Sequence, residues 1–233
     1  MTKRIHWRMI FLLDKQFIDT IMKSGGMLHV SGAAGSGKTL FASILASILS
    51  EKGYVDWIST DGKAGFVKHI RSNLEHYGGI SSNISVTRVM GYDETLQVIL
   101  SMDQRLKENT RLIVIDSITR VLDMSRNDPL LWGRTLFEDA LPTLASISEG
   151  RRVPIVLISE IRESQGVPSA VYHEKIRKWA KWDLVFERPH GLNQSKILQE
   201  GGGETSQMQI GTLQLNPAGW ANLTIEMISM EVQ

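Results

Sequence analysis

Apolar positions over roughly the first three quarters of the chain alternate between unbroken runs and spaced repeats. Residues 112–115 and 153–158 are nearly continuous in Ile, Val and Leu, as is typical of central parallel strands covered on both faces. Residues 38–52 carry apolar side chains at the i, i+3, i+4, i+7 spacing of a buried helical face, which predicts a helix. Further strands are expected at residues 27–31, 54–59 and 86–90, and further helices at 94–107, capped by Asp93, and 131–149, kinked at Pro142. The alternation predicts an α/β fold in three layers around a mostly parallel sheet.

The pattern changes after about residue 183. Short strands are predicted at residues 184–187, 195–198, 207–215 and 222–227, with tight turns between them, one of them at residues 201–203. These strands are expected to form an antiparallel extension at the edge of the sheet. Because no long linker, repeat or low-complexity tract interrupts the sequence, residues 1–233 are predicted to be a single domain. Residues 1–26 are its N-terminal lead-in and residues 184–233 its C-terminal β extension.

A glycine-rich segment joins the first predicted strand to the first predicted helix. It reads GAAGSGKT from Gly32 to Thr39 and fits the phosphate-binding pattern G-x-x-x-x-G-K-[ST] at every position. Small residues let successive backbone N–H groups turn toward phosphate oxygens, and the helix N-terminus adds its dipole. Lys38 is predicted to reach the β- and γ-phosphates of ATP, although the alternative is a chance glycine turn. The predicted nucleotide-binding residues are Gly32, Ala33, Ala34, Gly35, Ser36, Gly37, Lys38, Thr39, Leu40 and Asp116.

A second element of the predicted site is the apolar strand that ends at Asp116. An apolar strand that ends in a carboxylate has the form of a Walker B segment, and open α/β sheets bind ligands at the carboxyl ends of their strands. Asp116 and Thr39 are therefore predicted to hold Mg²⁺. The alternative is an ordinary Asp at the end of a strand, capping the next turn.

From this strand onward the sequence resembles the RecA/RadA recombinase superfamily. The segments that carry the resemblance are LIVIDSIT at residues 112–119, Leu13-Asp14 and Gly25-Gly26 before the phosphate loop, Thr60-Asp61-Gly62, and ISEIR at residues 158–162. Because only about 30 residues precede the loop, the resemblance is to core-only archaeal RadA paralogues of the RadB or KaiC-like type. It implies a RecA-type P-loop ATPase that uses ATP and Mg²⁺ and takes part in homologous recombination or DNA repair.

Two positions depart from the superfamily pattern. Asp61 stands where the resemblance implies a catalytic Glu that orients the attacking water. Asp is one methylene shorter, and a misplacement of about 1 Å can lower a rate by ~10²-fold. Weak hydrolysis is therefore expected, with Asp61 and Lys38 as catalytic residues; alternatively, Asp61 only forms a turn. Glu160 stands where the superfamily usually has a Gln that senses the γ-phosphate, and a carboxylate there repels the phosphate unless it is protonated or paired.

The resemblance also implies contacts with single-stranded DNA. The candidate residues are Arg120 and Arg126 after the Walker B strand, Arg162 and Tyr172 in a flexible loop, and Lys175, Arg177 and Lys178 on a helix expected over residues 172–182. The alternatives are a disordered surface loop and a surface helix with a solvated basic flank. A RadA-type recombinase and further copies of this chain are the protein partners that the resemblance implies.

Net charge and the content of cysteine and histidine limit the partners, location and metal sites that the sequence predicts. The formal charge of +1 requires any contact with nucleic acid to come from a local patch. The absence of cysteine fits a reducing, cytoplasmic location, and the apolar run at residues 9–13 is too short for a membrane helix. The six histidines lack ligand spacing, so no metal beyond nucleotide-bound Mg²⁺ is predicted. Phe66, Lys68 and His69 are candidates to pack on adenine.

Two other hypotheses stay open beside a role in recombination. A KaiC-like regulatory ATPase would act on protein partners without DNA. A small-molecule kinase on the same phosphate loop is disfavoured, because the sequence shows no Arg-rich lid.

Overall fold

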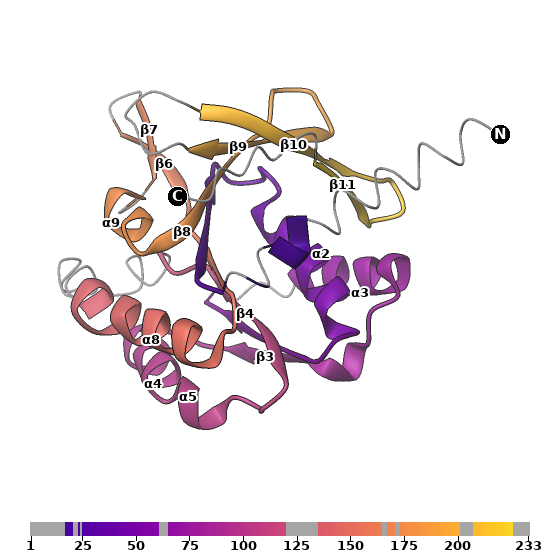
Figure 1. The fold of residues 1–233 in the computed structure, drawn as a ribbon. Helices are drawn as coiled ribbons and strands as arrows, with labels where there is room; N and C mark the ends of the chain where they lie inside the picture. Colours follow the sequence, from indigo (N-terminus) through magenta and orange to yellow (C-terminus); the bar gives the residue numbers. More distant parts are fainter. Residues whose placement is uncertain are drawn as a thin grey trace.

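A computed structural model describes residues 17–20, 23, 25–60, 65–119, 135–164, 167–170, 173–200 and 207–225. Within these residues a nine-stranded sheet runs through the molecule in the order β11-β10-β9-β8-β1-β5-β4-β2-β3 (Figure 1). Its strands are β1 (Met27–Gly32), β2 (Tyr54–Ser59), β3 (Ile84–Arg88), β4 (Thr110–Asp116), β5 (Ile155–Ile158), β8 (Ala180–Glu187), β9 (Gln194–Glu200), β10 (Gln207–Leu215) and β11 (Ala221–Ile225).

Six neighbouring strands, from β8 to β3, are parallel, whereas β9, β10 and β11 continue the sheet in antiparallel fashion. The prediction of a mostly parallel sheet with an antiparallel edge is therefore confirmed. Its boundary was misplaced, because β8 belongs to the parallel part through its pairing with β1. The parallel strands direct their carboxyl ends to one edge of the sheet, where open α/β folds place their ligands.

Helices cover both faces of the sheet, as Figure 1 shows. On one face lie α2 (Lys38–Ser50) and α3 (Gly65–Tyr77), and on the other lie α4 (Tyr92–Leu100), α5 (Met102–Arg105) and α8 (Leu141–Arg151). The two resulting cores are separate, one built on the α2 side around Phe41 and Trp57, the other on the α8 side around Ile113 and Leu144. None of the described helices has the length and apolar character that a membrane crossing requires.

Two predicted helices are divided in the structure. The helix expected at residues 94–107 is broken at Ser101 into α4 and α5, and Gly91, not Asp93, takes its N-cap position. Within the described part of the helix expected at 131–149, the π-helix η2 (Leu136–Ala140) precedes α8, and Pro142 lies in the first turn of α8. Proline has no N–H to give to the preceding turn, which explains why the change of helix type falls beside it.

The segment after β5 differs most from the predictions. In place of a flexible loop, β6 (Ile161–Ser164) and β7 (Val167–Ala170) form an antiparallel hairpin. The helix expected over residues 172–182 is only the short α9 (His173–Arg177), because Ala180 already starts β8. Pairing with β1 holds residues 180–182 in the sheet, and this long-range pairing overrides the helical spacing of the apolar residues.

Candidate nucleotide-binding site

The glycine-rich segment forms the turn between β1 and α2 at the carboxyl edge of the sheet. Gly32 ends β1 with φ +153°, and a Cβ on it would lie 2.5 Å from the carbonyl oxygen of Phe186. Gly37 caps α2 with φ +98°, and a Cβ there would lie 2.8 Å from a methyl group of Leu213. Backbone conformation and close neighbours from the C-terminal strands together require glycine at these two positions.

Lys38 lies against this turn. Its Nζ donates hydrogen bonds of 2.8 Å to the carbonyl oxygens of Gly32 and Ala33, and only 7% of the residue is exposed. Burial lowers the pKa of Lys38, while the nearby charges of Glu160 and Asp116 act in the opposite direction. The ammonium group is thus partly desolvated at the turn, a setting in which an anion gains more from it than in water.

The turn fits a phosphate group. Ala33, Ala34 and Gly35 are exposed at the mouth of the turn, and α2 begins directly behind it. The hydroxyl of Ser36 is buried and has no hydrogen-bond partner among the described groups. Phosphate oxygens would supply the acceptor that this donor lacks, in the position where the helix dipole favours an anion.

Thr39 and Asp116 also meet at this edge. The hydroxyl of Thr39 donates a 2.9 Å hydrogen bond to Oδ2 of Asp116, although the two residues are 77 positions apart in the chain. Both are partly exposed. A hydroxyl and a carboxylate beside a phosphate site are oxygen ligands of the type that Mg²⁺ prefers. Leu40, which was also predicted to bind nucleotide, is buried in the α2-side core.

A set of hydroxyl groups that the sequence analysis missed fixes the end of β4. Thr60 follows β2; its Oγ1 donates to the carbonyl oxygen of Ser117 at 2.8 Å and accepts from the Ser117 N–H at 2.9 Å. Thr119 accepts a hydrogen bond of 3.2 Å from the backbone N–H of Glu160. Both threonines lie in segments that carry the superfamily resemblance, but the sequence analysis assigned neither of them a role. Together they link the ends of β2, β4 and β5 around the site.

A cavity of about 270 Å³ extends from the phosphate turn toward the antiparallel strands. Its lining comprises Gly35, Gly37, Lys38, Thr39, Leu40, His69, Arg188, Asn193, Ser195, Leu213 and Leu215. Arg188 donates to the carbonyl oxygen of Gly35 at 3.2 Å and to Asn193 Oδ1 at 3.3 Å. The sequence analysis missed this wall because its residues lie far along the chain from the phosphate turn.

Of the three residues predicted to pack on adenine, only one lies at the cavity. His69 lines the cavity. Phe66 is buried and stacks on Trp57 with ring centroids 5.5 Å apart, so it belongs to the α2-side core and not to a ligand pocket. Lys68 is exposed on α3. The candidate general base Asp61 lies outside the described residues.

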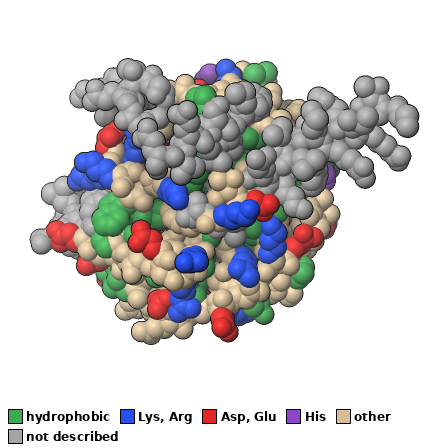
Figure 2. Space-filling model, in the orientation of Figure 1, with side chains coloured by type: hydrophobic (Ala, Val, Ile, Leu, Met, Phe, Trp, Pro, Cys, Tyr) green, Lys and Arg blue, Asp and Glu red, His purple; other side chains and the backbone are tan. Residues whose placement is uncertain are grey.

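The predicted DNA-binding residues are only partly described. Arg120, Arg126 and Tyr172 lie outside the described residues, and Arg162 lies on β6. Lys175 and Lys178 are exposed. Arg177 instead points to acidic groups, 3.2 Å from Oε2 of Glu200 and 3.7 Å from Oδ2 of Asp183. Figure 2 shows Lys and Arg side chains in the middle of one face with Asp and Glu side chains among and around them.

The chain has a fold of the RecA type, in which a glycine-rich turn of the P-loop sequence pattern follows the central β1 and the carboxylate of Asp116 lies beside Thr39. The structure is similar to a solved structure described as the RadB recombinase, with a TM-score of 0.64 and 18% sequence identity over 84% of this chain and 89% of that one. No protein-family profile matches the chain, and no curated protein sequence does. The comparison confirms the RecA/RadA-type recombinase fold that the sequence predicted.

Proposed function

We propose that this chain binds ATP with Mg²⁺, hydrolyses it slowly, and modulates homologous recombination or DNA repair by binding single-stranded DNA. The observation that carries the proposal is the arrangement of Lys38, Thr39 and Asp116 at the carboxyl edge of a RecA-type sheet. In this scheme Gly32 to Leu40 hold the phosphates, and Thr39 and Asp116 hold the metal. Bound Mg²⁺ supplies charge neutralisation at the phosphates when present. A single continuous nine-stranded sheet, with β11 and β3 at its edges, supports one core domain.

Glu160 connects this site to the proposed DNA-facing hairpin. It directly precedes β6, and its charge acts on Lys38. The basic Lys38 offsets the repulsion that a carboxylate here exerts on a γ-phosphate. The same residue therefore lies between the nucleotide and the β6–β7 hairpin, where nucleotide state can influence the orientation of the hairpin.

A regulatory ATPase of the KaiC-like type, which acts on protein partners without DNA, is the second candidate. The engagement of Arg177 by Glu200 and Asp183 favours it, because it removes one predicted cation from a DNA surface. A RadA-type recombinase or further copies of this chain are the proposed protein partners of either candidate.

Fluorescence anisotropy with labelled single-stranded DNA separates the two candidates. Binding is expected to weaken with salt, with a log–log slope of about −0.7 for each phosphate contact. Replacing Lys175 and Lys178 together by Ala is expected to reduce that slope by roughly one contact or more. Arg105→Ala is the matched control, because Arg105 is exposed on α5, away from the hairpin. Titrations with and without Mg-ATP test the coupling through Glu160, and no binding at low salt selects the regulatory candidate.

Asp61→Glu is expected to raise the rate of ATP hydrolysis. The added methylene carries the carboxylate closer to the position of the attacking water, and a gain of about 10-fold corresponds to ~1.4 kcal/mol of transition-state stabilisation. Single-turnover hydrolysis of radiolabelled ATP measures this step directly, with Asp61→Asn as the variant that lacks the base. An equal or lower rate in the Glu variant would show that Asp61 serves only as a turn residue.

A further inference from the structure

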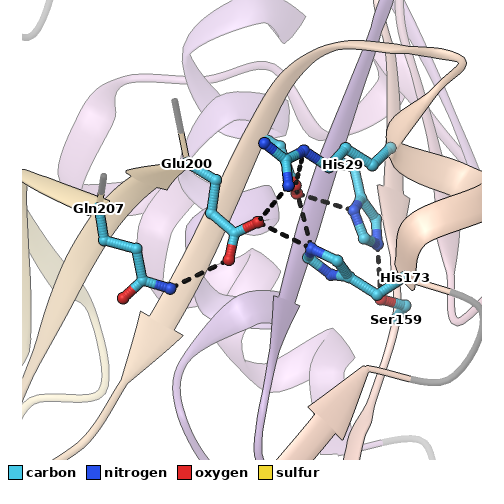
Figure 3. A network of polar contacts seen from close by, with 7 residues as sticks. His29, Ser159, His173, Glu200 and Gln207 are labelled. Atoms are coloured by element: carbon cyan, nitrogen blue, oxygen red, sulfur yellow. Dashed lines mark hydrogen bonds and ion pairs between the residues drawn. The ribbon is translucent and has the colours of Figure 1, made fainter. Parts of the chain in front are cut away.

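Four side chains with metal-ligand chemistry converge beside α9, away from the phosphate turn. His29 on β1 and Asp183 on β8 are register partners, and Nδ1 of His29 lies 2.8 Å from Oδ1 of Asp183. His173, which starts α9, places Nε2 3.2 Å from Asp183 Oδ2 and 3.0 Å from Oε2 of Glu200 on β9. Figure 3 shows His29, His173 and Glu200 turned toward one another. Two imidazoles and two carboxylates therefore meet from four separate elements.

One carboxylate oxygen in this cluster has no hydrogen bond. Oδ2 of Asp183 is buried and forms ion pairs with His173 and Arg177 but no hydrogen bond among the described groups, and the Asp183 side chain is only 5% exposed. Nε2 of His173 can hydrogen-bond in one direction only and is aligned with Glu200, so its contact with Asp183 is close without being a hydrogen bond. Arg177 is 3.7 Å away, beyond hydrogen-bond distance. In the metal-free protein His173 and Arg177 balance the charge of this oxygen, and a metal ion held by His173 and Asp183 would take over that role.

His29 has the second contact expected of a metal ligand. Its Nε2 lies 2.6 Å from the hydroxyl of Ser159, which follows β5 (Figure 3). In the metal-free protein the Ser159 hydroxyl donates to Nε2 and the Nδ1–H of His29 donates to Oδ1 of Asp183. A metal ion on Nδ1 would replace that proton, and Nε2–H would then donate to Ser159. Metal-binding histidines are commonly oriented in this way by a partner on the other ring nitrogen.

We propose that His29, His173, Asp183 and Glu200 bind a transition-metal ion of the Zn²⁺ class. Donors of imidazole nitrogen and carboxylate oxygen suit this ion, whose bonds of ~2.0–2.2 Å place tetrahedral donors roughly 3.3 Å apart. Donor atoms of His29, His173 and Asp183 all lie within 4.8 Å of one another, so small side-chain rotations bring them to that spacing. The ion ties α9 and β9 to β1 and, through Ser159, to the start of the β6–β7 segment.

Untagged full-length protein, without nucleotide, is titrated with Co²⁺ and then with Zn²⁺. One equivalent of Co²⁺ is expected to give the visible absorption of a tetrahedral complex, and one equivalent of Zn²⁺ to abolish it. His173→Ala removes a ligand and is expected to weaken binding by more than the ~10- to 100-fold that loss of an outer-shell partner costs. His190→Ala, which alters an exposed histidine outside the cluster, should bind as the parent does.

Arg177 provides a test that a folding defect cannot imitate. Its guanidinium contacts both carboxylates and competes with an incoming cation, so Arg177→Gln is expected to bind Zn²⁺ at least several-fold more tightly. Lys38→Ala, which alters only the nucleotide site, should bind the metal normally. The proposal is overturned if Co²⁺ gives no saturable absorption, or if His173→Ala and Arg177→Gln bind Zn²⁺ with the same affinity as the parent.

Discussion

Lys38→Ala is expected to abolish ATP binding at micromolar nucleotide. Nζ of Lys38 lies at the phosphate turn within reach of two loop carbonyls, in a position where 7% of the residue is exposed. Truncating one partner of a buried, hydrogen-bonded charge pair costs about 2–5 kcal/mol, which is roughly 30- to 5,000-fold in affinity. Equilibrium titration with a fluorescent ATP analogue measures the loss.

The matched control for this substitution is Lys52→Ala. Lys52 follows the same helix α2 but is exposed, and it pairs with Asp19 at 3.1 Å. An exposed pair of this kind contributes little, so nucleotide affinity should be unchanged. Thermal unfolding without nucleotide checks that both variants fold, because the Lys38→Ala protein also loses two hydrogen bonds to the turn. ATP affinity equal to that of the parent in a folded Lys38→Ala protein would remove Lys38 from the site.

Gly32→Ala is expected to destabilise the protein by about 3 kcal/mol. The added methyl group would lie 2.5 Å from the Phe186 carbonyl oxygen and 2.6 Å from Ser36 Oγ, and residue 32 has φ +153°. Overpacking of this kind costs ~1–3 kcal/mol, and the unfavourable backbone conformation adds ~1–2 kcal/mol. For a chain of this size, the unfolding midpoint should fall by roughly 6–12 °C.

Gly35→Ala separates the two causes. Gly35 lies in the same turn with φ +76°, but a Cβ on it meets nothing within 4 Å. This variant carries the conformational cost alone, so its midpoint should fall by only about a third as much. Differential scanning fluorimetry of both variants, without nucleotide, makes the comparison. Equal shifts in the two variants would show that the clash with β8 contributes nothing at Gly32.

Local patterns were sufficient for most of the α/β architecture. Continuous apolar runs predicted β4 and β5, and the helical spacing over residues 38–52 predicted α2. These predictions hold because burial on both faces of a strand, or on one face of a helix, determines the spacing of apolar residues along the chain. The boundary at Ala180 was wrong because pairing with β1, and not local spacing, determines the state of that segment.

The candidate site likewise has a part that local sequence predicted and a part that it did not. The motif from Gly32 to Thr39 is contiguous, so its place between strand and helix could be predicted, and the strand-end position of Asp116 as well. The contact of Thr39 with Asp116 over 77 positions, the bond from Arg188 to Gly35, and the approach of Glu160 to Lys38 depend on how strands are ordered in the sheet. No local pattern encodes that order.

The histidines show most directly what local sequence patterns do not predict. His29, His173 and Asp183 are scattered in the sequence and predicted no metal site, yet β1 and β8 pair in register and α9 folds back beside them. The sequence by itself determined the class of fold, the glycine-rich turn and the strand-end carboxylate, because each depends on residues that are adjacent in the chain. Only the tertiary structure decided the cavity wall, the hydroxyl links around β4 and the histidine–carboxylate cluster, because these are set by the pairing of strands distant in the chain.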